Sequence, residues 1–178
     1  MNLAELFMRI SEIMKDRIPF VMIGGFAVNA YKFGRQTGDI DLMIVDTDFK
    51  KAQAAMATIN YTPFEQTSSF ARFRDNKSNQ MGIDFIFVDQ ETMNTILKES
   101  KKITVAQAEF LVPSLKHLIA LKLHALKNNF NHRVGKDLRD ILELVAINKV
   151  DIKSDDFKNL CLRYGTPELY QKILSETP

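Results

Sequence analysis

The apolar residues of this 178-residue chain change their spacing at Pro113, and this change constrains the fold more than any other feature. Before Pro113, short apolar runs of strand length alternate with segments of helical period. After it, every long segment has helical period. Strands that alternate with helices favour a mixed sheet covered by helices, in the α/β or α+β class. We therefore expect an α/β core over residues 1–112 and a helical part over residues 113–178 that packs on the core.

The same spacing predicts the individual elements. In the first part we expect helices over 3–17, 26–33, 49–59 and 91–98, strands over 20–23, 39–45, 70–74 and 81–88, and an extended stretch over 102–112. In the second part we expect helices over 114–126, 136–147, 154–163 and 167–174. Gly34 is expected to close the helix over 26–33, and residues 128–134 are expected to form a polar loop.

Composition and charge narrow the class of protein. The net charge of +2, from 24 basic and 22 acidic residues, does not suggest a dedicated nucleic-acid binder, because such domains usually carry a clear basic excess. The single cysteine, Cys161, cannot form an intramolecular disulfide and suits a reducing compartment. No signal peptide is evident, and no apolar stretch approaches the roughly 20 residues that span a bilayer. We expect a soluble, cytoplasmic protein without membrane contact.

Two carboxylates begin the strand predicted over 39–45. Residues two apart in a strand point to the same face, so Asp39 and Asp41 share one face of the sheet. Two adjacent carboxylates repel each other, and a divalent cation such as Mg²⁺ removes that repulsion. The alternative is a polar strand end at the rim of a sheet, which many Asp-x-Asp segments are.

A third carboxylate stands alone in an apolar strand. Asp84 is the only charged residue in 81–88, and a lone carboxylate in such a run needs a partner. If this strand lies beside the strand over 39–45, Asp84 completes a cluster suited to two-metal phosphoryl-type transfer. Asp84 is then the candidate general base for an acceptor hydroxyl. Alternatively, it pairs with Arg72 or Arg74 of the preceding strand.

A glycine pair, Gly24-Gly25, lies between a predicted strand and a predicted helix. Glycines at such a turn let a phosphate approach backbone N–H groups, although backbone geometry alone can also require them. The sequence has no Walker lysine pattern and no G-x-G-x-x-G. One helix and one turn fill the gap to Asp39, so we expect the glycines and the carboxylates at the same end of adjacent strands.

These motifs together resemble the DNA polymerase β-like nucleotidyltransferase superfamily. The resemblance is carried by Ile23-Gly24-Gly25, by Arg35-x-Thr37-x-Asp39-Ile40-Asp41 and by Ile83-Asp84-Phe85. With a helical C-terminal part, the chain looks most like the AbiEii-type toxin branch. The resemblance implies a nucleotidyltransferase that moves a nucleoside monophosphate from an NTP to an acceptor hydroxyl, on a target such as tRNA or a protein. It also implies an antitoxin partner.

The resemblance assigns roles to individual residues. It implies that Mg²⁺ or Mn²⁺ binds at Asp39, Asp41 and Asp84, and that the nucleotide binds at Gly24, Gly25, Arg35, Thr37 and Lys122. It also implies a catalytic lysine and aspartate from the helical part, and Lys122 and Asp137 match them. Two other functions remain open: an antibiotic- or protein-modifying nucleotidyltransferase, and a non-catalytic nucleotide-binding module of the same fold.

Helical projection tests the last two residues independently. Lys122 falls near the centre of an apolar arc, so it must either extend to solvent or meet an anion. Asp137 falls at the edge of the next apolar stripe, whereas Asp140 is expected to point away and pair with Lys136.

The histidines and a basic region complete the candidates. His117, His124 and His132 lack metal-ligand spacing, and we expect them at the surface. Five basic residues, Lys127, His132, Arg133, Lys136 and Arg139, form either a solvated face or a region that guides RNA or a triphosphate.

Overall fold

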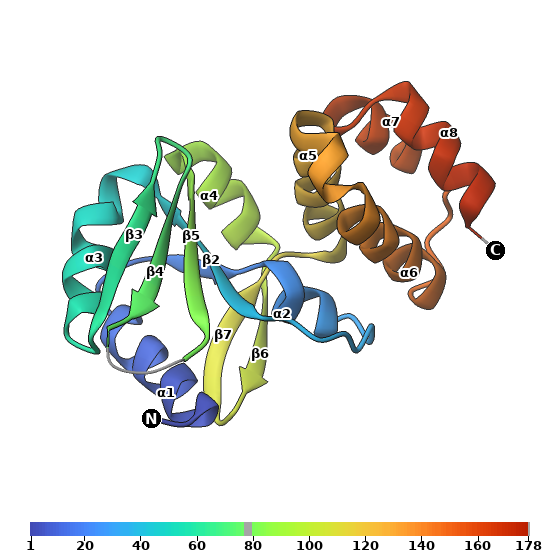
Figure 1. Cartoon of the computed structure of the whole chain (residues 1–178). Coiled ribbons are helices and arrows are strands. Elements are labelled where there is room, and N and C mark those ends of the chain that lie inside the picture. Colours follow the sequence, from blue (N-terminus) through green and yellow to red (C-terminus); the bar gives the residue numbers. More distant parts are fainter. Residues whose placement is uncertain (77–79, 178) are drawn as a thin grey trace. The chain divides into compact units, whose positions relative to one another are not determined.

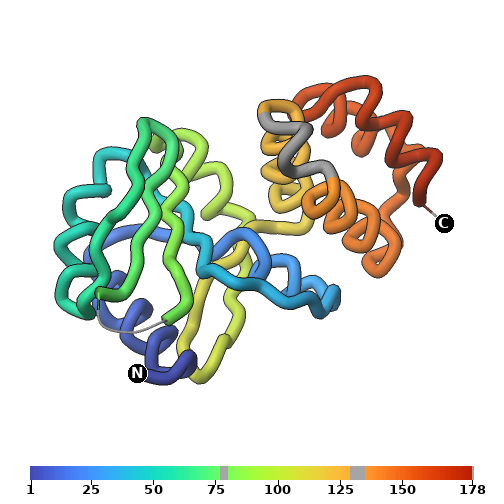
Figure 2. The backbone as a smooth tube through the Cα atoms, viewed as in Figure 1, coloured from blue at the N-terminus to red at the C-terminus, as the bar shows by residue number. Residues whose placement is uncertain are grey.

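The computed structural model describes residues 1–76 and 80–177, without the side chains of residues 129–134. The chain folds into two compact units, whose backbone is traced in Figure 2. One unit consists of Met1–Ala27 and Arg35–Ser114, and the other of Val28–Gly34 and Leu115–Pro178. None of the described helices combines the length and the apolar character that a membrane span requires.

The first unit is built on a five-stranded mixed sheet with the order β1-β2-β5-β4-β3 (Figure 1). Its strands are β1 (Phe20–Met22), β2 (Asp39–Val45), β3 (Tyr61–Gln66), β4 (Phe70–Asp75) and β5 (Gly82–Val88). β2 and β5 run parallel, and the other neighbouring pairs are antiparallel. A separate antiparallel hairpin joins β6 (Lys101–Val105) to β7 (Ala108–Val112). The mixed sheet confirms the predicted fold class.

Alternation along the central strands separates an apolar face from a polar one. Ile40 and Leu42 of β2, and Ile83 and Phe85 of β5, are completely buried. On the same face, the ring of Phe49 contacts the rings of Phe73 and Phe87. The aspartates of β2 and β5 lie on the opposite face and are half-buried.

The helices of this unit start and end where their sequences dictate. They are α1 (Leu3–Met14), α2 (Gly24–Asn29), α3 (Phe49–Ala57), which follows a 3₁₀ turn, and α4 (Gln90–Lys98). Asn2 and Glu5 form a reciprocal capping box at the start of α1. Asp89 caps α4 by accepting a hydrogen bond from the Thr92 N–H at 2.7 Å.

The second unit is helical. It contains α5 (Leu115–Arg133), a π-helical turn (Val134–Leu138), α6 (Arg139–Ile147), α7 (Asp155–Tyr164) and α8 (Pro167–Glu176). Ser154 and Thr166 cap α7 and α8, and Pro167 occupies the first turn of α8, where its missing N–H costs nothing. The segment Val28–Gly34 belongs to this unit, and Asn148 Nδ2 donates to the Tyr31 carbonyl at 3.2 Å.

Three local predictions are wrong. The helix expected over 26–33 is α2, which starts at Gly24 and ends at Asn29. The left-handed residue after it is Lys32 (φ 70°) instead of Gly34. The polar loop expected over 128–134 is helical, because α5 continues to Arg133. The stretch predicted as extended over 102–112 is extended, and it forms the β6–β7 hairpin, which turns at Ala106 and Gln107 with φ values of 48° and 70°.

Candidate metal and nucleotide site

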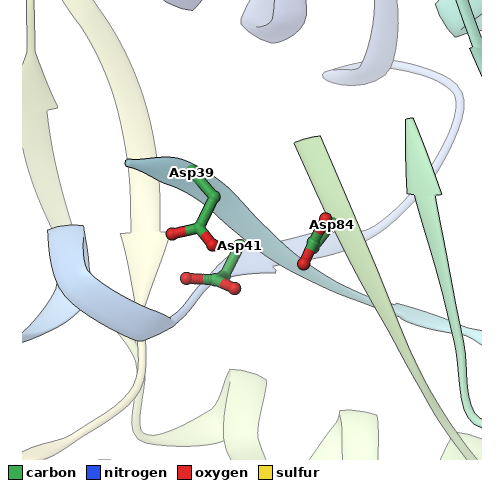
Figure 3. Close-up of side chains that lie close together, drawn as sticks. All are labelled: Asp39, Asp41 and Asp84. Carbon is green, nitrogen blue, oxygen red and sulfur yellow. The ribbon is translucent and has the colours of Figure 1, made fainter. Parts of the chain in front are cut away.

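Strand register brings the three predicted carboxylates together. In the parallel pair of β2 and β5, Asp41 lies directly across from Asp84, and Asp39 lies across from Gly82. One oxygen from each of Asp39, Asp41 and Asp84 lies within 4.8 Å of the others. Figure 3 shows the carboxylates of Asp39 and Asp41 on one side of β2, with Asp84 beside them on β5. The site expected from the sequence is therefore assembled.

Electrostatics at this cluster favour a cation. Burial raises the pKa of Asp84, the Arg72 guanidinium opposes that shift, and the charge of Asp39 adds to it. Three oxygen donors on two rigid strands suit a hard divalent cation such as Mg²⁺ or Mn²⁺, which prefers carboxylate ligands. All three side chains are half-buried, so the cluster has access to solvent. The carboxylates are consistent with a divalent-metal site.

Arg72 lies next to the cluster. Its Nε donates to Asp84 Oδ2 at 3.3 Å, and its Nη1 donates to Glu65 Oε2 at 2.8 Å. The two expectations for Asp84 therefore hold together, because it joins the carboxylate cluster and also pairs with an arginine. Arg74 instead lies over the Phe64 ring, with 3.8 Å between its Cζ and the ring centroid.

The glycine turn lies against Asp41. Gly24 has a left-handed backbone (φ +61°), and a Cβ added to it would lie 2.5 Å from Asp41 Cγ and 2.8 Å from Asp41 Cβ. Directly before the turn, the Ile23 N–H donates to the Asp41 carbonyl at 2.9 Å, which holds the glycine pair beside β2. Only glycine meets both requirements at this position.

Gly25 contacts the segment that precedes β2. A Cβ added to Gly25 would lie 2.5 Å from Thr37 Oγ1 and 3.3 Å from Arg35 Nη1. Thr37 Oγ1 in turn donates to the Asp39 carbonyl at 3.2 Å or to Asp39 Oδ1 at 3.3 Å. Arg35, Thr37 and the glycine pair thus surround the start of the strand that carries the carboxylates.

Lys122 and Asp137 meet in the helical unit. Lys122 Nζ lies 2.9 Å from Asp137 Oδ1 and 2.6 Å from Asp140 Oδ2, and all three residues are buried. Of the two outcomes predicted for Lys122, extension to solvent or contact with an anion, the structure shows the second. The prediction that Asp140 points away is wrong. Asp137 and Asp140 are three residues apart and share a helix face, and this spacing was the signal that could have identified Asp140.

The histidines take no part in a described metal group. His117 is half-buried, and His124 is exposed, with its Nε2 at 3.1 Å from Asn128 Nδ2. Among residues 1–76, 80–128 and 135–177, the only group with metal-ligand geometry is the aspartate cluster. The side chains of His132 and Arg133 lie outside the described residues, whereas Lys127, Lys136 and Arg139 are exposed.

A mixed sheet that places three aspartates on adjacent parallel strands, with a glycine turn against one of them, defines a metal-dependent nucleotidyltransferase. Residues 9–178 match the family model described as "Nucleotidyl transferase AbiEii toxin, Type IV TA system". The chain belongs to this family of toxins. Membership implies an NTP substrate and an antitoxin partner.

Solved structures share the fold at low sequence identity. The complex of ANT(2″)-Ia with adenylyl-2″-tobramycin matches with a TM-score of 0.67 and 13% identity, over 90% of this chain and 95% of that chain. An antigenic nucleotidyltransferase-like protein from Paracoccidioides brasiliensis matches with a TM-score of 0.58 and 13% identity, over 97% and 92%. Lincomycin-bound lincosamide adenylyltransferase LnuA gives 0.57 and 14%, over 82% and 98%. No curated protein matches this chain in sequence.

Proposed function

We propose that this protein transfers a nucleoside monophosphate from an NTP to an acceptor hydroxyl, with Mg²⁺ or Mn²⁺ held by Asp39, Asp41 and Asp84. The observation that carries the proposal is the parallel register of Asp41 and Asp84, which gathers three oxygen ligands within 4.8 Å. In the transfer, the acceptor oxygen bonds to the α-phosphorus, the bond to the bridging oxygen breaks, and pyrophosphate leaves.

Asp84 is the candidate general base in this reaction. Its pKa is raised by burial, so it is a stronger base than an exposed aspartate while Arg72 stabilises its charged form. It would accept the proton of the acceptor hydroxyl as the new bond forms. A bound divalent cation would supply charge neutralisation at the triphosphate. Asp39 and Asp41 would hold that cation from β2.

The remaining roles are predictions from the resemblance. Gly24, Gly25, Arg35, Thr37 and Lys122 are proposed to bind the nucleotide, and Lys122 and Asp137 are proposed to take part in catalysis. The contacts of Gly24 and Gly25 with the Asp39–Asp41 segment support the first assignment. We also propose that residues 1–112 form the transferase core and that residues 113–178 form an accessory helical part.

The acceptor is proposed to be RNA, with tRNA as the first candidate and a protein side chain as the second. Family membership supports a macromolecular target of a toxin, and the exposed residues Lys127, Lys136 and Arg139 provide positive charge. A small-molecule acceptor is the competing proposal, because the similar structures include ANT(2″)-Ia with adenylyl-2″-tobramycin and LnuA with lincomycin. Three mutually repelling carboxylates argue against a non-catalytic binding module.

Radiolabelled NTPs test the proposal directly. The protein is incubated with each labelled NTP, Mg²⁺ or Mn²⁺, and total RNA, cell protein or aminoglycoside and lincosamide acceptors. We expect label in one acceptor class and its loss in Asp41→Asn, with circular dichroism confirming that the fold is intact. If no acceptor is labelled and no NTP is consumed with either metal, the proposed activity is wrong. An adjacent small reading frame whose product blocks labelling would identify the antitoxin.

A further inference from the structure

A row of charged side chains crosses four strands of the sheet. Cross-strand pairing places Asp41 of β2 opposite Asp84 of β5, Asp84 opposite Arg72 of β4, and Arg72 opposite Glu65 of β3. Directly paired residues on neighbouring strands point to the same face, so the four charges share the face that holds the metal cluster. The row connects the metal cluster to the exposed edge strand of the sheet.

Arg72 is held from three directions within this row. Its Nε donates to Asp84 Oδ2 at 3.3 Å, and its Nη1 donates separately to Glu65 Oε2 at 2.8 Å. Its Cζ also lies 5.0 Å from the centroid of the Phe70 ring, two residues earlier on the same strand. The guanidinium is planar with fixed donor directions, so two carboxylates and a ring together define its orientation.

We propose that Arg72 is a positioning residue for Asp84, with Glu65 as its anchor. This inference rests on the proposed function, because it assigns Arg72 a task for the carboxylate that holds the metal. By donating to one oxygen of Asp84, Arg72 fixes the plane of the carboxylate and thereby the direction in which its remaining lone pairs face the cation. Partners that orient a metal ligand in this way commonly affect metal affinity or activity by about 10–100-fold.

The competing explanation is that Arg72 only offsets negative charge. The two explanations differ in the sign of one measurement. If Arg72 acts by charge alone, Arg72→Gln removes a repelling cation and Mn²⁺ binds more tightly. If Arg72 orients Asp84, Arg72→Gln weakens Mn²⁺ binding. Since the Arg72 side chain is 42% exposed, water screens its charge and the orienting effect should dominate.

The experiment measures Mn²⁺ binding to the full chain by electron paramagnetic resonance of unbound Mn²⁺, without NTP, beside kcat and KM for the NTP. We expect Arg72→Gln to raise the Mn²⁺ Kd and lower kcat by about tenfold or more, with the NTP KM changed less than threefold. Arg72→Lys keeps the charge but loses the planar fork, and it should fall between the wild type and Arg72→Gln. Glu65→Gln should change both quantities in the same direction and less than Arg72→Gln.

Arg74→Gln is the matched control. It removes the same charge from the same strand two residues away, where Arg74 lies over Phe64, and it should leave Mn²⁺ binding and kcat within twofold of the wild type. If Arg72→Gln binds Mn²⁺ with an affinity equal to or higher than that of Arg74→Gln, the positioning role is overturned. An Arg72→Lys variant with the Mn²⁺ affinity and kcat of the wild type overturns the positioning role as well. Circular dichroism and Tm verify that each variant is folded.

The binding measurement separates this inference from the proposed function. If the wild type binds Mn²⁺ but transfers no nucleotide to any acceptor, the proposed activity fails while the effect of Arg72 on Mn²⁺ affinity is still measured. If the wild type transfers nucleotide and Arg72→Gln matches it in both kcat and Mn²⁺ affinity, only the role of Arg72 fails.

Discussion

Gly24→Ala should damage stability and metal binding together. An alanine held at φ +61° costs about 1–2 kcal/mol in left-handed backbone strain. Its Cβ would lie 2.5 Å from Asp41 Cγ, well inside contact distance, and inserting a group into such a packed position costs about 1–3 kcal/mol. The lower entropy of the unfolded alanine chain returns about 0.4–1 kcal/mol. The net loss in unfolding free energy should be about 1–5 kcal/mol.

The assay is urea denaturation of Gly24→Ala beside Gly38→Ala. Gly38 precedes Asp39 directly, and a Cβ added there meets no atom within 4 Å and needs no left-handed backbone. Gly38→Ala should therefore be neutral or stabilising by up to about 1 kcal/mol. In Gly24→Ala, the Asp41 side chain must move away from the new methyl group, so we also expect weaker Mn²⁺ binding.

The predicted loss of stability is refuted if the unfolding free energies of Gly24→Ala and Gly38→Ala lie within about 0.5 kcal/mol of each other. Neither the φ angle of Gly24 nor its contact with Asp41 would then have the energetic cost assigned to it. If Gly24→Ala is destabilised but binds Mn²⁺ as tightly as the wild type, only the expected effect of the new methyl group on Mn²⁺ binding at Asp41 is refuted.

Three further predictions concern buried groups. Lys122→Met leaves Asp137 and Asp140 buried without their shared cation, and it should lower the unfolding free energy by about 3–5 kcal/mol in urea denaturation. Burial raises the pKa of Cys161 to about 12, so Ellman's reagent at pH 8 should leave the native thiol unmodified and react only after unfolding. Burial raises the pKa of Asp84, so the folded state binds its proton more tightly than the unfolded state, and this group's contribution to stability falls as pH rises above the ordinary aspartate pKa of 3.8. Asp84→Asn should remove that fall and raise Tm at pH 7 without metal. If Asp84→Asn and the wild type have the same Tm profile between pH 4 and 7, the prediction is wrong.

The predictability of each element depended on how its side chains are buried. β2 and β5 lie side by side in the sheet interior, and their near-continuous apolar sequences identified both strands almost to the residue. β3 escaped prediction. It is an edge strand whose residues after Tyr61 are mostly exposed, and it contains Pro63, so neither alternation nor propensity marks it as a strand.

The cluster of three aspartates could be predicted because each of its parts obeys a local rule. Spacing of two in a strand put Asp39 and Asp41 on one face, and the isolation of Asp84 in an apolar run required a partner. The contact of Arg72 with Asp84 was one of the predicted alternatives. The contact of Glu65 with Arg72 could not be predicted, because it depends on the register of β3 against β4 and β3 was not predicted as a strand. Local patterns thus identified the three aspartates, whereas the pairing of β3 with β4 was needed to find the contact of Glu65 with Arg72.

Two charged clusters among the described residues differ in exposure, and this difference decides which of them can take a cation from solvent. Lys122 is 6% exposed, and its Nζ lies 2.9 Å from Asp137 Oδ1 and 2.6 Å from Asp140 Oδ2, so the charges of this cluster already have partners. The aspartates of β2 and β5 are half-exposed and carry excess negative charge, so a cation from solvent can reach them. Metal should therefore stabilise the wild type and the Lys122→Met variant by equal increments in Tm, and it should fail to stabilise Asp41→Asn. Equal stabilisation of Asp41→Asn by Mn²⁺ would place the cation elsewhere.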